Sequence, residues 1–152
     1  MFMKFLLTLI ISILFFTSCT NAKQEEVTNP DPALQIIIDS FFKKYESSPS
    51  EAVDYIFNTN KTFPPQQTIE LKDKLVNAAL LIGAFNGYEQ IVSKSTTSSL
   101  ILCSYLAKHD KQPLRITFIF YKPKDKWILY KFKFDDSVDA ELQESGRIYF
   151  IK

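Results

Sequence analysis

Histidine, cysteine and glycine are scarce in this 152-residue chain, and their scarcity limits the chemistry that it can carry. There is one histidine, His109, beside two cysteines and three glycines. The sequence contains no H-x-x-x-H or C-x-x-C pair and no glycine-rich phosphate loop, so it predicts no metal site and no cofactor. We expect His109 to be a solvated turn residue; a role as ligand or base is the alternative.

An excess of either charge is also lacking. Lysine and arginine together number 18 and aspartate and glutamate 17, without a basic cluster. Because nucleic-acid-binding proteins present a basic patch, we expect no nucleic-acid partner. Cys103 lies in the middle of a predicted strand, whereas a nucleophilic thiol needs a base and a partly exposed, electropositive setting. We therefore expect Cys103 to be a buried structural thiol.

The first 18 residues are typical of an export signal. Lys4 supplies a positive charge, and residues 5–16 form an apolar segment of about a dozen residues, shorter than the ~20 that a spanning helix needs. Residues 16–19, Phe-Thr-Ser-Cys, resemble a bacterial lipoprotein box, in which small residues precede a cysteine that is acylated, although leucine is commoner than Phe16 there. This resemblance implies a signal peptide over 1–18 and a palmitate-type lipid on Cys19. Ordinary signal cleavage after Ala22 is the alternative.

Residues 19–30 have few apolar side chains and no periodicity, and we expect a flexible tether there. One domain should follow over residues 31–152. With Cys19 lipidated, Cys103 would be the sole thiol, so we expect no internal disulfide. The segment over 23–26, Lys-Gln-Glu-Glu, is similar to acidic export signals of some Bacteroidota lipoproteins. The combined expectation is a lipid anchor in the outer membrane of a Gram-negative bacterium, on its periplasmic or its surface side.

Three helices are predicted at the start of the domain. Asp31 is suited to cap the first, with Pro32 at its first position. Residues 48–51, Ser-Pro-Ser-Glu, form a capping box for a short second helix. A third helix is expected from about residue 66 to 82, ending at Gly83. The apolar stripe of the first helix consists of Leu34, Ile37, Ile38, Phe41 and Tyr45.

After residue 87 the apolar period changes from 3.6 to 2. Residues 88–94 and 100–108 are typical of strands, and residues 114–135 of a β-hairpin. For the tail we expect a helical turn over 138–144 that Gly146 breaks, with a fifth strand over 148–151 as one option. An uninterrupted hairpin with an odd loop gathers on one face Leu114, Ile116, Phe118 and Phe120 with Ile128, Tyr130, Phe132 and Phe134.

Helices followed by antiparallel strands predict an α+β fold, with three N-terminal helices packed on one face of a curved four- to five-stranded antiparallel meander. This order of elements, with the hairpin turn from Phe120 to Trp127, resembles the nuclear transport factor 2-like, cystatin-like cone fold. Many small Bacteroidota lipoproteins of unknown function look like this. The resemblance implies a cone-like domain over about residues 31–152 and says almost nothing about function.

Enzymes of that superfamily resemble this fold and work inside the cone, with an Asp or His base and Tyr donors in an apolar pocket. The inward rows of this hairpin contain no carboxylate. We therefore expect no catalytic residue and a cone filled by Phe118, Phe120, Phe132 and Phe134. The competing hypothesis is a small-molecule binder, or an isomerase- or dehydratase-like enzyme, with polar contacts from Tyr105, Tyr130 and His109.

The outward face of the hairpin is the predicted interface. Relatives of this fold often dimerise through that face, and aromatic side chains often anchor such contacts. The alternative is that the tail or the sheet curvature buries the cluster within one monomer. The sequence thus favours a lipid-anchored, non-catalytic envelope domain that binds a partner protein or forms a homodimer through its sheet. The residues expected at this interface are Ile119, Tyr121, Trp127 and Leu129.

The lipid anchor makes the first prediction. Replacing Cys19 by alanine removes the only thiol that the signal enzymes could acylate there, so Cys19→Ala should release the protein from the membrane fraction. Fractionation of cells that express either form, followed by immunoblotting, measures this. Recovery of Cys19→Ala in the membrane fraction at the parental level would contradict lipidation at this residue.

Overall fold

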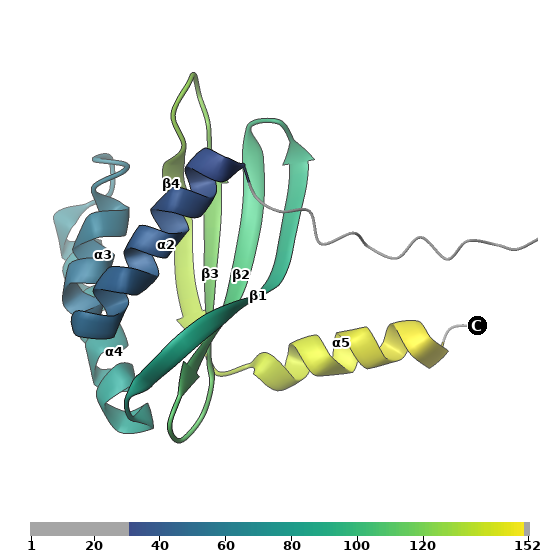
Figure 1. Ribbon diagram of the computed structural model, residues 1–152. Helices are drawn as coiled ribbons and strands as arrows, with labels where there is room; N and C mark the ends of the chain where they lie inside the picture. The colour runs from purple at the N-terminus through teal and green to yellow at the C-terminus, as the bar shows by residue number, and fades with distance from the viewer. Residues whose placement is uncertain (1–30, 151–152) are drawn as a thin grey trace, which may run out of the picture.

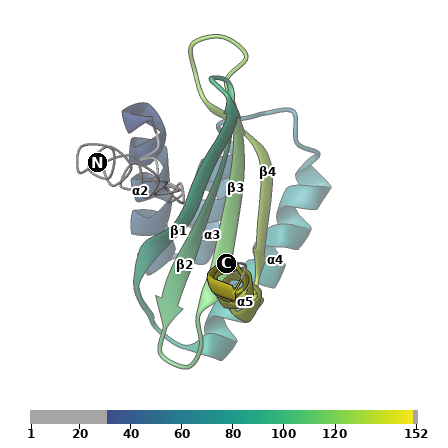
Figure 2. The same cartoon turned by 90° about the vertical axis from the view of Figure 1, so that its right-hand side faces the viewer.

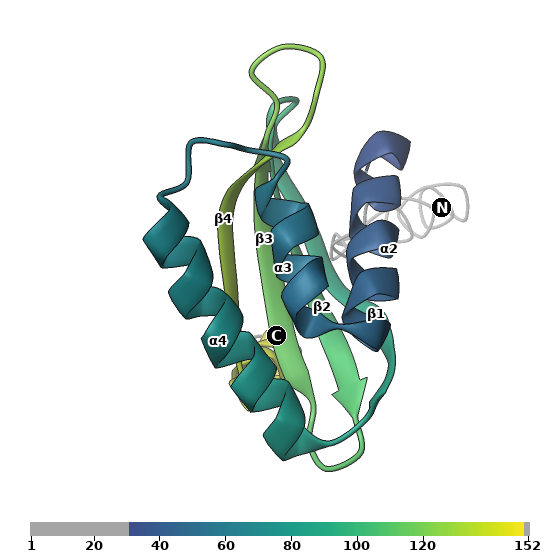
Figure 3. The same cartoon turned by 90° about the vertical axis from the view of Figure 1, so that its left-hand side faces the viewer.

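The computed structural model describes residues 31–150, and the fold is α+β. Three helices precede one open antiparallel sheet, in which the strand order β1-β2-β3-β4 follows the chain. Figures 1 and 3 show the three helices together on one side of the sheet. The predicted leader and the tether with Cys19 lie outside the described residues. The elements are α2 (Pro32–Ser47), α3 (Pro49–Phe57), α4 (Pro65–Ile82), β1 (Phe85–Thr97), β2 (Leu100–His109), β3 (Leu114–Tyr121), β4 (Ile128–Asp135) and α5 (Val138–Phe150).

Local capping sets the helix ends where the sequence predicts them. Asp31 Oδ1 accepts a hydrogen bond from the backbone N–H of Ala33 at 3.0 Å, at the start of α2. Ser48 Oγ accepts one from the backbone N–H of Glu51 at 3.3 Å, at the start of α3. The last helix of the three ends at Gly83, whose φ of 93° lies in the left-handed region that favours glycine.

Aromatic rings fill the space between α2 and the sheet. Phe118, in the centre of β3, is fully buried. The centre of its ring lies 5.0 Å from that of Phe41 in α2, 5.7 Å from Phe120 and 5.4 Å from Phe132. Phe134 is only partly buried, at the margin of the cluster. The prediction that phenylalanines of the hairpin fill the interior is confirmed for Phe118, Phe120 and Phe132 and not for Phe134.

The hairpin register departs from the prediction because β4 contains a bulge. Phe118 pairs with Phe132, as predicted for a hairpin with an odd loop, but Phe120 pairs with Leu129. One extra residue in β4 turns the side chains before it to the opposite face of the sheet. Leu129 is therefore 0% exposed on the helix side. Tyr130, which was expected to point inward, is 62% exposed.

The C-terminal segment is one helix rather than a helical turn and a fifth strand. α5 continues from Val138 through Gly146 to Phe150, so the prediction that this glycine breaks the helix is wrong. A glycine inside a helix costs about 1 kcal/mol relative to alanine, but it keeps its backbone N–H and can remain in the helix. Within residues 31–150 the sheet has four strands.

The loop between β3 and β4 is fastened to the start of α2. Trp127 Nε1 donates a hydrogen bond to Asp31 Oδ2 at 3.0 Å. Lys122 Nζ lies 3.5 Å from the same oxygen and 4.7 Å from the centre of the Trp127 ring. The hydrogen bonds from Trp127 and from the backbone of Ala33 lower the pKa of Asp31 from its ordinary value. One carboxylate thus caps α2 and holds the β3–β4 loop.

Two neighbouring substitutions in β4 test the bulge. Leu129→Ala should lower the free energy of unfolding by about 2–5 kcal/mol, because it opens a cavity in a filled interior. Tyr130→Ala should change it by no more than about 0.5 kcal/mol, since that side chain is exposed. Urea unfolding followed by circular dichroism measures both. The reverse pattern, with the larger loss at Tyr130, is the one an uninterrupted hairpin would give and would contradict the bulged register.

Candidate functional site

One face of the sheet points away from the three helices. Figure 2 views the molecule from this side, with α5 seen end-on in front of the lower part of the sheet. Figure 1 shows that α5 leaves the end of β4 and extends away from the sheet rather than across it. Within the described part of the chain, most of this face is therefore left without a covering layer. We call it the open face.

A strip of apolar side chains runs down the middle of the open face. Side chains alternate along a strand, so the residues of β2 and β3 between the core positions point to this side. Leu100 is directly opposite Tyr121, and Leu102 is directly opposite Ile119. All are partly accessible to solvent. The strip, called the central strip below, consists of Leu100, Leu102, Leu106, Ile119 and Tyr121.

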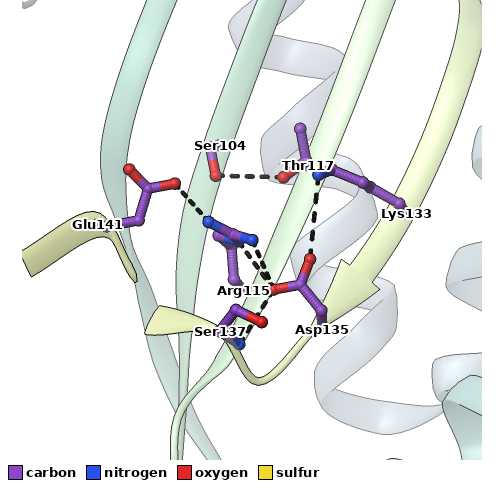
Figure 4. Close-up of polar contacts among 7 residues, drawn as sticks. All are labelled: Ser104, Arg115, Thr117, Lys133, Asp135, Ser137 and Glu141. Atoms are coloured by element: carbon purple, nitrogen blue, oxygen red, sulfur yellow. Dashed lines mark hydrogen bonds and ion pairs between the residues drawn. The ribbon is translucent and has the colours of Figure 1, made fainter. Parts of the chain in front are cut away.

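Two hydroxyl groups interrupt the central strip. Ser104 and Thr117 are direct partners in β2 and β3, and their side-chain oxygens lie 3.2 Å apart. Figure 4 draws this contact as a dashed line. Both residues are buried although they lie on the open face. Because one hydroxyl donates to the other, each oxygen keeps a hydrogen-bond partner when this part of the face is covered.

Arg115 ties the base of α5 to the open face. Its Nη1 lies 2.6 Å from Glu141 Oε1 in α5, and its Nη2 lies 2.8 Å from Asp135 Oδ1 at the end of β4. Figure 4 shows the guanidinium between the two carboxylates. The hydrogen bond to Asp135 is the main cause of a raised Arg115 pKa. Burial alone would raise the pKa of Asp135, but the bonds from Arg115 and from the backbone of Ser137 lower it.

Charged side chains border the central strip. Lys131 and Lys133 of β4 pair with Ile119 and Thr117 of β3, respectively, and both lysines are exposed. The first turn of α5 is acidic, with Asp139 and Glu141. Leu142, one residue further along the same helix, is 72% exposed. An apolar centre with a charged border is the usual composition of a protein interface.

Only half of the predicted interface residues lie on the open face. Ile119 and Tyr121 do, whereas Leu129 is fully buried among the helices and Trp127 is 8% exposed and bonded to Asp31. The placement of these last two was wrong because the bulge reverses the start of β4. The leucines of β2 were not among the predicted interface residues, although their alternation with core residues from Leu100 to His109 was a usable signal.

The three residues predicted for a pocket are not brought together. Tyr105 is buried in the core, where its hydroxyl donates to Gln90 Oε1 at 3.4 Å, and Tyr130 is on the surface. His109 is partly buried at the end of β2, so its prediction as a solvated turn residue is wrong. Cys103 is buried as predicted, and burial raises its pKa to about 11.

The imidazole of His109 has a partner at each nitrogen. Nδ1 lies 2.8 Å from the carbonyl oxygen of Gly83, which can only accept, so Nδ1 carries a hydrogen. In the neutral ring Nε2 then accepts from the hydroxyl of Tyr45 at 3.2 Å. An open hollow of about 410 Å³ lies beside the pair, lined by apolar residues of α4 and by Glu46. The side chain of His109 thus links β2 to the end of α4.

No family model, curated protein or solved structure matches the chain. Within residues 31–150 no group of three or more His, Cys, Asp or Glu side chains could hold a metal ion. No helix in that same range is long and apolar enough to cross a membrane. The open face is the site that the remaining geometry supports.

The tie between Arg115 and α5 gives a prediction for hydrogen exchange. Arg115→Gln removes both ion pairs and leaves a shorter, uncharged polar side chain, so the amides of α5 should exchange about tenfold faster or more. Hydrogen–deuterium exchange with mass spectrometry measures this, and Lys131→Gln, an exposed lysine on the same face, is the control. Unchanged exchange of α5 in Arg115→Gln would contradict the tie.

Lowering the pH should also accelerate hydrogen exchange in α5. The folded-state pKa of Asp135 lies below its ordinary value of about 3.9, so the tie contributes fully above that pH. The contribution is lost as the pH falls through the lowered folded-state value. Exchange of α5, corrected for the intrinsic pH dependence, should therefore accelerate below about pH 4 in the parent chain and show no such step in Arg115→Gln.

Proposed function

We propose that the protein is a lipid-anchored, non-catalytic domain of a Gram-negative envelope that holds another protein chain against its open face. The observation that carries this proposal is the central strip, an apolar band bordered by lysines and without a covering layer among residues 31–150. The anchor on Cys19 comes from the lipoprotein resemblance of residues 16–19. The proposal places the domain at the outer membrane, on either side.

The dimensions of the open face suit a protein partner. Four strands at ~4.8 Å spacing and eight residues of ~3.3 Å rise give a face of roughly 500 Å². A stable interface buries about 800 Å² per partner, so the sheet alone falls short. α5 is 13 residues long, about 20 Å, and one side of it adds roughly 200 Å². Sheet and helix together come close to the usual size.

A second copy of the chain is the occupant that the charges favour. The open face carries exposed lysines on β4, Lys131 and Lys133, and the same chain carries the exposed Asp139 at the base of α5, beside Glu141, one oxygen of which is bound by Arg115. A two-fold axis would bring the acidic helix of each copy to the basic border of the other, which is the self-complementary arrangement of an isologous dimer. A different envelope protein is the other outcome that the test below can give.

The competing function, a small-molecule binder or an isomerase- or dehydratase-like enzyme, is favoured by the hollow beside His109. Its volume of about 410 Å³ is within the range of ligand sites. However, the Tyr45 hydroxyl and both nitrogens of His109 already have partners. Among the side chains that line the hollow, this leaves Glu46 as the polar group available to a ligand. The open face offers more specific contacts.

A double substitution in the central strip tests the proposed function. Leu102→Thr with Ile119→Thr keeps residues that strands tolerate but removes apolar area from the middle of the interface. We expect self-association to weaken at least tenfold, because centrally placed interface side chains carry most of the binding energy. Sedimentation velocity over a range of protein concentrations measures it.

The matched control changes two exposed leucines away from the open face. Leu80 and Leu81 of α4 are 76% and 73% exposed, and Leu80→Thr with Leu81→Thr should leave association unchanged. If the parent chain is monomeric, loss of a co-purifying envelope protein in the strip variant alone would support a different partner on the same face. Equal association or capture by the parent and the strip variant would overturn the proposal.

A further inference from the structure

The described chain begins at the same end of the molecule that carries the β3–β4 loop. Asp31, the first described residue, accepts hydrogen bonds from Trp127 at 3.0 Å and from Lys122 at 3.5 Å, at the two ends of that loop. Figures 1 and 2 show the loop protruding beyond the sheet at the end where α2 starts. Any segment that precedes residue 31 therefore joins the domain beside this loop.

This end of the molecule is basic in a chain that has almost no net charge. The loop contributes Lys122, Lys124 and Lys126 against Asp125, and the carboxylate of Asp31 is engaged as described. Residues 123–126, at the tip of the loop, are exposed. Four lysines thus face two aspartates here once Lys61 is included, whereas the whole chain has a formal net charge of +1.

Lys61 joins this group through the connection between α3 and α4. Asn60 Nδ2 donates to the carbonyl oxygen of Leu129 at 2.8 Å, and the backbone N–H of Leu129 donates to Thr59 Oγ1 at 3.0 Å. Both bonds fix the connection to the start of β4, directly after the basic loop. Lys61 itself is exposed. The basic end is therefore built by two loops that the fold holds together.

The predicted lipid anchor would hold this end close to a bilayer. Cys19 precedes Asp31 by 12 residues. A segment of that length spans at most about 43 Å when fully extended, and a random chain of the same length spans about 20 Å on average. The anchored domain would keep its basic loops within that distance of the lipid headgroups.

We propose that the β3–β4 loop and Lys61 bind anionic lipid headgroups and orient the anchored domain on the membrane. This inference rests on the lipid anchor of the proposed function. The loop lies at the end of the strands, so the sheet would stand upright on the bilayer, and α5 and the open face would point sideways (Figure 1). Two copies in one membrane would then meet through their open faces.

The strength of the effect follows from surface electrostatics. Each lysine close to an anionic membrane contributes about fivefold to binding, and salt near 1 M shortens the range of the interaction to about 3 Å. Two lysines of the loop therefore change the membrane-facing population by about 25-fold. The lipid anchor itself is apolar and insensitive to salt, which separates the two contributions.

Trp127 supplies the readout, because it is the only tryptophan of the chain and sits at the end of the basic loop. The processed, lipidated protein is reconstituted in phosphatidylcholine vesicles with or without phosphatidylglycerol, each with nitroxide-labelled headgroups that quench a nearby indole. We expect stronger quenching of Trp127 in the anionic vesicles and its loss at high salt. We expect the same loss in Lys124→Gln with Lys126→Gln, which leaves the bond between Lys122 and Asp31 intact.

Lys43→Gln with Lys74→Gln is the matched control, since it removes the same charge from exposed positions on α2 and α4, and quenching should stay at the parental level. Equal quenching in neutral and anionic vesicles, or an unchanged signal in the loop variant, would overturn the orientation. A protein that fails to float with neutral vesicles would instead refute the lipid anchor. Co-sedimentation of that unanchored protein with anionic vesicles, lost in the loop variant, would still support headgroup binding by the loop.

Discussion

The packing of the aromatic row of β3 against α2 is the contact on which the rest of the domain depends. Phe118 and Phe120 are fully buried, and Phe41 of α2 stands edge-on to Phe118 at 5.0 Å between ring centres. Because side chains alternate along a strand, committing this row to the helices commits Ile119 and Tyr121 to the other face. The filled interior and the open face are two consequences of one register in β3.

Most of the fold could be predicted because its signals are local. The caps at Asp31 and Ser48 act within three residues, and period 3.6 or 2 distinguishes helices from strands without knowledge of their partners. The bulge at Tyr130 could not be predicted, since it depends on which side chain of β4 packs against the helices. Leu129 fills that place, and Trp127 then reaches Asp31, a contact across 96 positions of the chain.

The same distinction explains the candidate site. Ile119 and Tyr121 were assigned to the open face correctly because β3 pairs with β2 without a shift, so its alternation holds from end to end. In β4 the alternation fails at Tyr130, so the two predicted interface residues before it, Trp127 and Leu129, do not lie on the open face. His109 was misjudged for a related reason, because its partners are Tyr45 in α2 and Gly83 just after α4, and its own neighbours in sequence do not indicate either contact.

The edges of the sheet explain why the face, rather than a strand edge, is the surface left for association. β1 has three irregularities in its pairing with β2, and β4 has its own bulge, so neither edge presents a regular row of backbone groups. Lys131 and Lys133 add exposed charge along β4. Bulges and edge lysines both oppose edge-to-edge pairing of sheets. Neither edge therefore favours pairing with another sheet, and the helices cover one face. The apolar area still open to a partner lies on the other face, along β2 and β3. There the hydrogen bond between Ser104 and Thr117 allows the surface to be covered.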